Sequence, residues 1–227
     1  ARGANSGIQD TDNLCWKLAR VLRGESPDTL LASYDAERVE AADENILNST
    51  RATDFITPKS AVSRTFRDAV LALSRQHPFA RRLVNSGRLS MPTMHRASPL
   101  STPDRSAFSG ALVPGAPAAD APVQSAGRPG WLLDHLGGRF DLLLFDAEDD
   151  VAQRLAAGLG DAVRIVRITS SGAVKGQLID FEGHAEHRYD GRPGTAYLLR
   201  PDQHVAARWR SASVDDVRAA LWRAQGH

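Results

Sequence analysis

The stretches FDLLLF at residues 140–145, VAQRLAAGL at 151–159 and VRIVRI at 163–168 decide the fold of the C-terminal half of the chain. The first is a nearly continuous apolar run of strand length, and the second places its apolar residues at helical spacing. The third alternates between polar and apolar residues, as a strand does. The three stretches together predict a β-α-β unit.

The rest of this half completes the pattern. Two more strand-like runs, residues 195–199 and 205–209, flank the turn sequence RPDQ at 200–203, and Ser213 can cap a last helix that carries Val217 to Trp222. A β-α-β unit followed by a β-hairpin and a terminal helix is the order of elements in thioredoxin. We therefore predict a thioredoxin-like α/β domain.

The N-terminal part predicts helices alone. A loop leads into a first helix that ends near Gly24, and its apolar spacing predicts one buried face. The residues of that face are Ile8, Thr11, Cys15, Leu18 and Leu22. A second helix follows Ser26-Pro27-Asp28 and meets no Gly or Pro before Pro58, and a third runs from Ser60 to near His77-Pro78.

Residues 86–130 are rich in Pro, Ser, Gly and Ala, which is typical of an extended connection on the surface. We expect an α+β or α/β chain in three parts. These are a helical segment over residues 1–90, a Pro-rich linker over 91–109 and the thioredoxin-like domain over 110–227. Because the chain begins at Ala1, inside what reads as a glycine-containing loop, we also expect a part upstream of it.

The composition excludes several classes of function. The 227 residues carry a formal net charge of +1 with no block of like charges, so neither nucleic acid nor a membrane is an expected partner. No apolar run approaches the roughly 20 residues that cross a bilayer, and we expect a cytoplasmic protein. Lys occurs only at positions 17, 59 and 175, a bias toward Arg that indicates a GC-rich bacterial genome.

The most informative string is RGANSGIQD at residues 2–10, followed by NLCWKLA at 13–19. Gly3 and Gly7 let another group approach the backbone closely, and the following helix directs its unpaired N–H groups toward that group. A helix N-terminus carries roughly +0.5 of an elementary charge, which favours an anion or a carbonyl oxygen there. By itself, the same pattern is also that of an ordinary turn and helix cap.

The string resembles the second flavin fingerprint of the class A FAD-dependent aromatic-ring hydroxylases, which include phenol, 3-hydroxyphenylpropionate and polyketide hydroxylases. In that family the loop and the helix N-terminus lie against the pyrimidine end of the isoalloxazine. The resemblance implies that Gly3, Ala4 and Asn5 contact the flavin, with Ser6 and Gly7 at the start of the helix. Their N–H donors would stabilise the negative charge of reduced flavin.

Further stretches extend the resemblance. LLASYDAER at residues 30–38 is similar to the next helix of the family, and we expect Glu37 and Arg38 to fix helix ends or to pair locally. WLLD at 131–134 and LRPD at 199–202 resemble the thioredoxin-like domain that many of these hydroxylases carry. The family implies a role in structure and subunit contact for this domain.

The single cysteine limits what the chain can do. It excludes a disulfide framework, a cysteine-built zinc site and a CxxC redox centre. Because no cysteine follows Cys15, the thioredoxin-like domain has no thiolate with which to exchange disulfides. Cys15 itself falls on the predicted apolar face of the first helix, where we expect a packed thiol.

Two groups of side chains invite a metal site. They are His184, Glu186 and His187, and Asp146, Asp149 and Asp150. The two histidines of the first group lie in what reads as loop or strand and lack a convincing third ligand, and the second group precedes a helix, where acids favour the N-terminus. We predict no metal site.

The family implies an enzyme that binds FAD, reduces it with NADH or NADPH, and hydroxylates a phenolic or other aromatic small molecule through a flavin C4a-hydroperoxide. Its catalytic residues and the rest of its FAD-binding segment would lie upstream of Ala1, and a homodimer is the expected assembly. The alternative is a non-enzymatic dimerisation or interaction module.

Since this chain carries only part of the implied flavin site, we expect it, expressed alone, neither to retain FAD nor to turn over an aromatic substrate. The measurement is the visible absorbance spectrum of the purified chain. Flavin absorbance that co-purifies with it would contradict this expectation.

Overall fold

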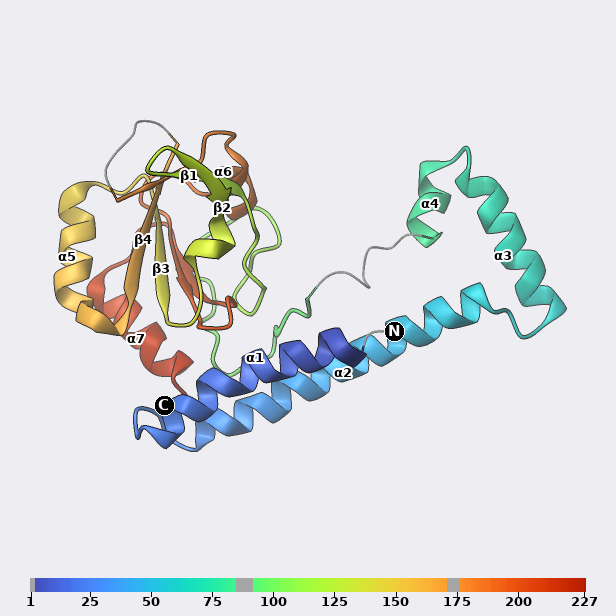
Figure 1. The fold of residues 1–227 in the computed structure, drawn as a ribbon, viewed down its shortest axis with the longest axis horizontal. Helices are drawn as coiled ribbons and strands as arrows, with labels where there is room; N and C mark the ends of the chain where they lie inside the picture. Colours follow the sequence, from blue (N-terminus) through green and yellow to red (C-terminus); the bar gives the residue numbers. More distant parts are fainter. Residues whose placement is uncertain (1–2, 85–91, 171–175) are drawn as a thin grey trace.

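A computed structural model describes residues 3–84, 92–170 and 176–227 of the chain. Arg2 of the flavin-like string and the expected boundary between residues 90 and 91 lie outside these ranges. Figure 1 shows an elongated helical arm, formed by the N-terminal part, beside a part built from one sheet and the remaining helices.

The helices are α1 (Gly3–Leu22), α2 (Thr29–Ile56), α3 (Ala61–Ser74), α4 (Pro78–Val84), α5 (Asp149–Leu159), α6 (His184–Tyr189) and α7 (Val214–Ala224). There are also two 3-10 turns, η1 (Leu132–His135) and η2 (Gly160–Ala162). The strands are β1 (Pro122–Ser125), β2 (Arg128–Trp131), β3 (Asp141–Phe145), β4 (Arg164–Thr169), β5 (Leu178–Ile179), β6 (Ala196–Leu199) and β7 (Val205–Trp209).

The arm follows the predicted helices closely. α1 and α2 lie side by side, and α3 and α4 fold back at the far end of α2 (Figure 1). α2 ends at Ile56, just before Pro58, and the Ser60 hydroxyl caps α3 by accepting the Ser63 N–H at 3.1 Å. The fourth helix, α4, was not predicted from the sequence.

The sheet has the strand order β2-β1-β5-β4-β3-β6-β7. β3 and β4 are parallel and are joined by α5, whereas β6 and β7 form an antiparallel hairpin that leads into α7. The predicted β-α-β unit, hairpin and terminal helix are therefore confirmed. Strands β1, β2 and β5, which extend the sheet beyond β4, were not predicted from the sequence.

Both faces of the sheet are covered, which explains the continuous apolar run of β3. Leu142 and Leu144 pack with residues of α5 and α7, and Leu143 and Phe145 pack on the opposite face with residues of α6 and η1. All five residues of β3 are buried. A strand with two covered faces needs apolar side chains at successive positions instead of alternate ones.

Residues 92–121, which were expected to form a surface connection, lie along the edge strand β7. Backbone N–H groups of Thr102 and Gly115 donate to Ala206 and Val205, and the Val205 N–H donates to Ala116, at 2.7–2.8 Å. Several side chains of the segment are buried: Thr93, His95, Ser98, Leu100, Ala116 and Ala121. The segment is extended, as predicted, but it is only partly exposed, because it packs along the edge strand, whose N–H and C=O groups need partners.

α1 packs through the face opposite to the one that its apolar spacing predicts. Ile8 is 69% exposed, Leu22 is 78% exposed and Cys15 is exposed, so the expectation of a packed thiol was wrong. The buried side chains of α1 are polar, Asn13 and Lys17. The apolar residues of α1 do share one face, but that face is exposed. The opposite face is buried because Asn13 and Lys17 bind Glu37 of α2.

Within the described ranges, no helix combines the length and the apolar character that a membrane crossing requires.

Candidate functional site

The predicted flavin-contacting residues form the N-terminal end of α1. Gly3, Ala4, Asn5 and Gly7 are exposed, and Ser6 is half-buried. The helix begins at Gly3, whereas the sequence analysis placed a loop at residues 3–5 and the start of the helix at Ser6. These residues therefore form the first turn of a helix and not a loop.

This end of α1 has the chemistry that the sequence analysis sought. The first four N–H groups of a helix have no partner within the helix, and small side chains leave them accessible. A Cβ added at Gly3 or Gly7 would meet no atom within 4 Å. The Ser6 hydroxyl accepts a hydrogen bond from the Asn45 amide of α2 at 3.3 Å, which connects this end to the second helix.

A buried charge cluster lies beneath the middle of α1, formed by Lys17, Glu37, Arg200 and Asp202. Lys17 Nζ is 2.8 Å from Glu37 Oε2, and the Arg200 guanidinium donates to both oxygens of Glu37 at 2.6 and 2.9 Å. The same guanidinium contacts Asp202 at 2.5 Å. All four side chains are buried, and two cations face two carboxylates.

Neutral donors complete the cluster. The Asn13 amide donates to Glu37 at 2.8 Å and to Asp202 at 3.2 Å, and the Trp16 indole N–H donates to Asp202 at 3.0 Å. The Ser98 hydroxyl donates to Glu37 at 2.5 Å. α1, α2, the 92–121 segment and the β6–β7 turn therefore meet at the buried charge cluster.

The charge states follow from burial and from these partners. Burial alone would raise the pKa of Glu37 and of Asp202, but the Arg200 guanidinium holds both values well below their usual range. Burial lowers the pKa of Lys17 to about 8, although Glu37 opposes this shift. At neutral pH the cluster consists of two carboxylates, a guanidinium and an ammonium group.

Two histidines in ring contact, His95 and His204, adjoin the cluster. The rings of His95 and His204 have centroids 4.7 Å apart, and a cavity of about 30 Å³ beside them is also lined by Asp12 and Asn13. In the described part of the chain, neither ring nitrogen of His95 has a hydrogen-bond partner. Burial lowers the pKa of His95 to about 4, despite the nearby Glu37 carboxylate. His95 is therefore neutral at neutral pH.

The expectation for Glu37 was wrong, because its partner Arg200 is 163 residues away. Arg38 pairs with Asp10 of α1 at 2.5 Å instead of fixing a helix end. The roles of Lys17, Asn13, His95 and His204 were not predicted from the sequence. One signal in the sequence could have indicated the pair of Glu37 and Arg200. The two residues carry opposite charges and lie in the two family-like motifs at residues 30–38 and 199–202.

The two groups that invited a metal site have other roles. His184, Glu186 and His187 lie in α6, not in a loop or strand, because Gly183 and Asp190 in left-handed conformation bound a short helix there. Asp149 and Asp150 are in the first turn of α5, and Asp146 accepts hydrogen bonds from Thr169 and Ser170. Across the described residues, no three His, Cys, Asp or Glu side chains form a group that could hold a metal ion.

Two family models match the chain. One, described as FAD binding domain, matches residues 1–49. The other, described as aromatic-ring hydroxylase, C-terminal, matches residues 111–227. The two matches place α1 and the first part of α2 in one family domain and the sheet with its helices in the other.

Curated relatives match over almost the whole chain. A 6-methylpretetramide 4-monooxygenase of Streptomyces rimosus is 31% identical over 97% of this chain and 41% of its own length. A 2,4-dichlorophenol 6-monooxygenase of Delftia acidovorans is 29% identical over 97% of this chain and 44% of its own length. The chain therefore spans about two fifths of the length of these relatives.

Solved structures share the fold. An aklavinone-11 hydroxylase, crystallised with FAD and aklavinone, superposes with a TM-score of 0.68 at 23% identity, covering 100% of this chain and 41% of that one. BexE superposes with a TM-score of 0.65 at 27% identity, again over 100% of this chain and 41% of that one. Both superpositions include the arm and the sheet, so the two parts occur together in solved structures.

Arg200→Met removes the guanidinium that faces two buried carboxylates. We expect the free energy of unfolding to fall by about 3–5 kcal/mol, because buried charges lose their partner. Arg38→Met is the control, since it breaks the more exposed pair with Asp10 and should cost about 0–1 kcal/mol. Urea unfolding measures both, and equal losses would contradict the central role of Arg200.

The low pKa of His95 predicts an acid-sensitive stability. An unfolded chain takes up a proton on this residue below pH about 6.5, but the folded chain resists it until about pH 4. Stability is therefore expected to fall as the pH drops through that window, by up to about 3 kcal/mol in total. His95→Phe should make the midpoint of urea unfolding nearly independent of pH between pH 6.5 and 4.5. The control His77→Phe, at an exposed position, should leave the pH dependence of the midpoint unchanged.

Proposed function

The chain belongs to the aromatic-ring hydroxylase C-terminal family, and from this premise we propose that it is part of a monooxygenase that uses FAD and NADH or NADPH. The proposed reaction is hydroxylation of a phenolic or other aromatic small molecule. Support comes from the relatives, whose names describe monooxygenases of a dichlorophenol and of a methylpretetramide. The FAD-binding match over residues 1–49 supports the cofactor.

The observation that carries this proposal is the exposed N-terminal end of α1, a helix that the buried charge cluster holds in place. Gly3, Ala4 and Asn5 offer backbone N–H groups to a carbonyl oxygen or to negative charge on a flavin edge. The space beside Gly3 is open, since a Cβ placed there would meet no atom within 4 Å. The residues therefore fit the group. A bound FAD supplies redox chemistry and oxygen activation, which side chains do not provide.

The buried charge cluster would control the direction of these N–H groups. Asn13 is ten residues from Gly3, which corresponds to about 15 Å along the helix axis. Because Asn13, Trp16 and Lys17 are fixed through Glu37 and Asp202, α1 cannot turn about its axis without separating buried charges. Backbone donors that are already oriented pay no reorganisation energy when charge develops on their partner.

The proposed division of the chain follows the original expectation. Residues 1–90 would complete the FAD-binding part, 91–109 would connect it, and 110–227 would be the thioredoxin-like domain. Catalytic side chains would be supplied by the remainder of the protein, as would most contacts to the reductant and the aromatic substrate. A homodimer stays a prediction of the family resemblance.

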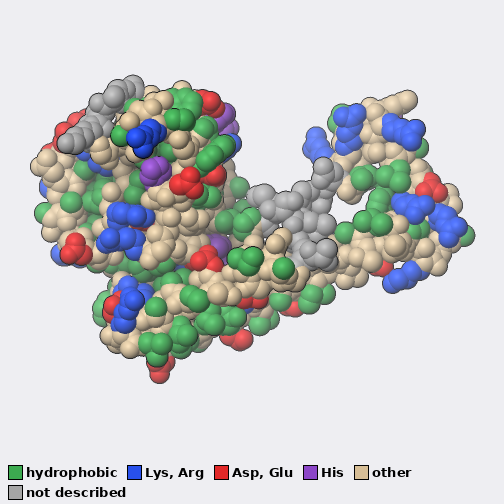
Figure 2. Space-filling model, in the orientation of Figure 1, with side chains coloured by type: hydrophobic (Ala, Val, Ile, Leu, Met, Phe, Trp, Pro, Cys, Tyr) green, Lys and Arg blue, Asp and Glu red, His purple; other side chains and the backbone are tan. Residues whose placement is uncertain are grey.

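A non-enzymatic interaction module is the second candidate, and one observation favours it. The arm exposes large apolar side chains along α2, α3 and α4, visible as green patches in Figure 2. Among them are Ile46, Ile56, Val62, Phe66, Phe79 and Leu83. Exposed apolar patches are typical of interaction sites. Flavin absorbance in the protein that carries this chain distinguishes the candidates, because an interaction module needs none.

Ala4→Asp tests the flavin site in the protein that carries this chain and the rest of its FAD-binding part. An acid in the first turn stabilises the helix, but it repels the negative charge of reduced flavin. We expect an unchanged or higher melting temperature together with a reduction potential lower by roughly 10–20 mV.

Ala32→Asp is the matched control, because Ala32 is exposed and lies in the first turn of α2. It should leave the flavin potential unchanged. Equal potentials in the two variants would contradict contact between Ala4 and flavin, and a flavin-free protein would contradict the proposed function itself.

A further inference from the structure

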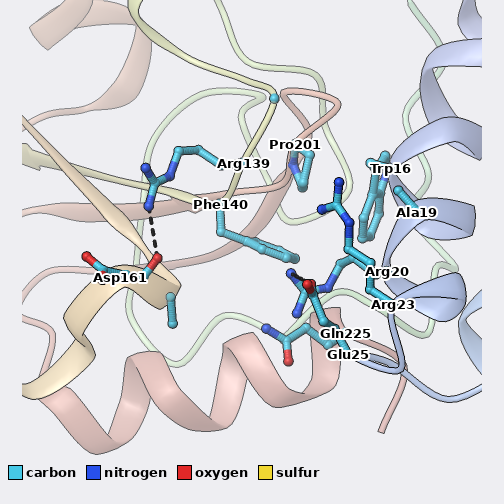
Figure 3. A pocket seen from close by; sticks show the side chains of 12 residues that line it. Trp16, Ala19, Arg20, Arg23, Glu25, Arg139, Phe140, Asp161, Pro201 and Gln225 are labelled. Atoms are coloured by element: carbon cyan, nitrogen blue, oxygen red, sulfur yellow. Dashed lines mark hydrogen bonds and ion pairs between the residues drawn. The ribbon is translucent and has the colours of Figure 1, made fainter.

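Several arginines beside the sheet have local partners. In the cleft between α1 and the segment that enters β3, Arg20 lies 3.3 Å from Glu25, and Arg139 donates to the backbone carbonyl of Asp161 at 2.9 Å (Figure 3). The far end of the arm differs, because most of its charged side chains have no counterion within the chain.

α3 and α4 form this far end, which we call the basic hook. Residues 61–84 contain five arginines but a single carboxylate, that of Asp68, which pairs with Arg67 at 2.8 Å. Figure 2 shows the resulting blue groups over this end of the arm. Three further arginines are exposed and, as far as the chain is described, form neither an ion pair nor a side-chain hydrogen bond: Arg64, Arg75 and Arg82.

The basic hook has little core of its own. Val70 and Ala80 are buried, but Phe79 is 61% exposed and Leu83 is 64% exposed. Phe79, Arg82 and Leu83 lie three and four residues apart, which places them on one face of α4. This face therefore combines exposed apolar carbon with an unpaired positive charge, as interaction surfaces often do.

α2 carries the opposite charge. Glu40, Asp43 and Glu44 are exposed, and their spacing places them with Leu47 in one row along the helix, which we call the acidic stripe. Burial, followed by repulsion from Glu44 and Glu37, raises the pKa of Glu40. Within the described ranges, no cation forms an ion pair with a carboxylate of the acidic stripe.

The basic hook and the acidic stripe do not neutralise each other within one chain. Ile56, the last residue of α2, lies about 18 Å along the helix axis from Glu44. Contacts at the start of the hook include the pair of Lys59 and Asp54 at 3.1 Å, which lies beyond the acidic stripe. Each of the two surfaces therefore needs a partner from another molecule.

We propose that a second copy of the chain covers both surfaces, with the basic hook of each copy on the acidic stripe of the other. A two-fold axis forms each of these contacts twice, so one dimer neutralises both surfaces of both copies. Phe79 and Leu83 would pack beside Leu47, with the opposite charges around them.

The two charged surfaces together favour a second copy over a membrane. An anionic lipid surface would attract the basic hook but repel the acidic stripe, so it accounts for only one of them. The family resemblance implies subunit contact through the thioredoxin-like domain, and the proposed interface on the arm is a different one. The proposal does not depend on the flavin assignment, because none of its residues belongs to the exposed end of α1.

The test is sedimentation velocity of the 227-residue chain at micromolar concentrations. We expect a dimer at low salt that dissociates as the salt concentration rises, because the contacts are ionic. A hook variant, Arg75→Glu with Arg82→Glu, and a stripe variant, Asp43→Arg with Glu44→Arg, each place like charges opposite one another. Each should weaken the dimer at least about tenfold.

Mixing the two variants provides the sharpest result. The reversed hook of one then faces the reversed stripe of the other, and the two unreversed surfaces also face each other, so the mixture should form a dimer of unlike chains. Its recovery shows that both variants fold, which far-ultraviolet circular dichroism also checks. Arg128→Glu with Arg223→Glu is the control, since it reverses two exposed arginines of the sheet part and should leave the dimer unchanged.

Several results would overturn the proposal. They are a monomer at low salt, a dimer that persists in both variants, a mixture that does not associate, and an equal loss in the control, which would place the interface on the sheet. Binding of phosphatidylserine vesicles by a chain that stays monomeric would identify a membrane as the partner of the basic hook instead.

Discussion

The two hydrogen bonds from Arg200 to Glu37 join the N-terminal helices to the sheet. Both side chains are buried, so neither charge can exchange its partner for water. A buried ion pair adds little net stability compared with well-packed apolar side chains, but removing one partner of the pair is costly. Its main effect is therefore geometric: α2 must lie where Glu37 meets both nitrogens of Arg200, and α1 must lie where Lys17 and Asn13 reach the same carboxylate.

This arrangement gives the C-terminal part a clear structural role. The β6–β7 turn supplies Arg200 and Asp202, and the indole of Trp16 on α1 is held by Asp202. A domain without redox cysteines thus still acts on the helix that carries the candidate flavin contacts. It does so through charge and hydrogen bonding.

Local signals in the sequence were sufficient for local structure. Ser213 caps α7 through a reciprocal hydrogen-bond pair with Asp216, three residues away, and the apolar run of β3 identified a strand that is covered on both faces. The partner of Glu37 could not be predicted in this way, because no local pattern specifies a contact across 163 residues. The buried face of α1 was missed for the same reason, since Asn13 and Lys17 resemble a solvent-facing side until Glu37 and Asp202 are placed against them.

The extended segment along β7 also has a consequence for solubility. An open sheet ends in two strands whose free backbone groups can recruit a strand from another molecule and so begin aggregation. Residues 102–118 occupy that position at β7. At the opposite edge, β2 is four residues long and contains Pro129, which has no N–H to donate. The chain is thus protected at both edges against growth of the sheet from one molecule into the next.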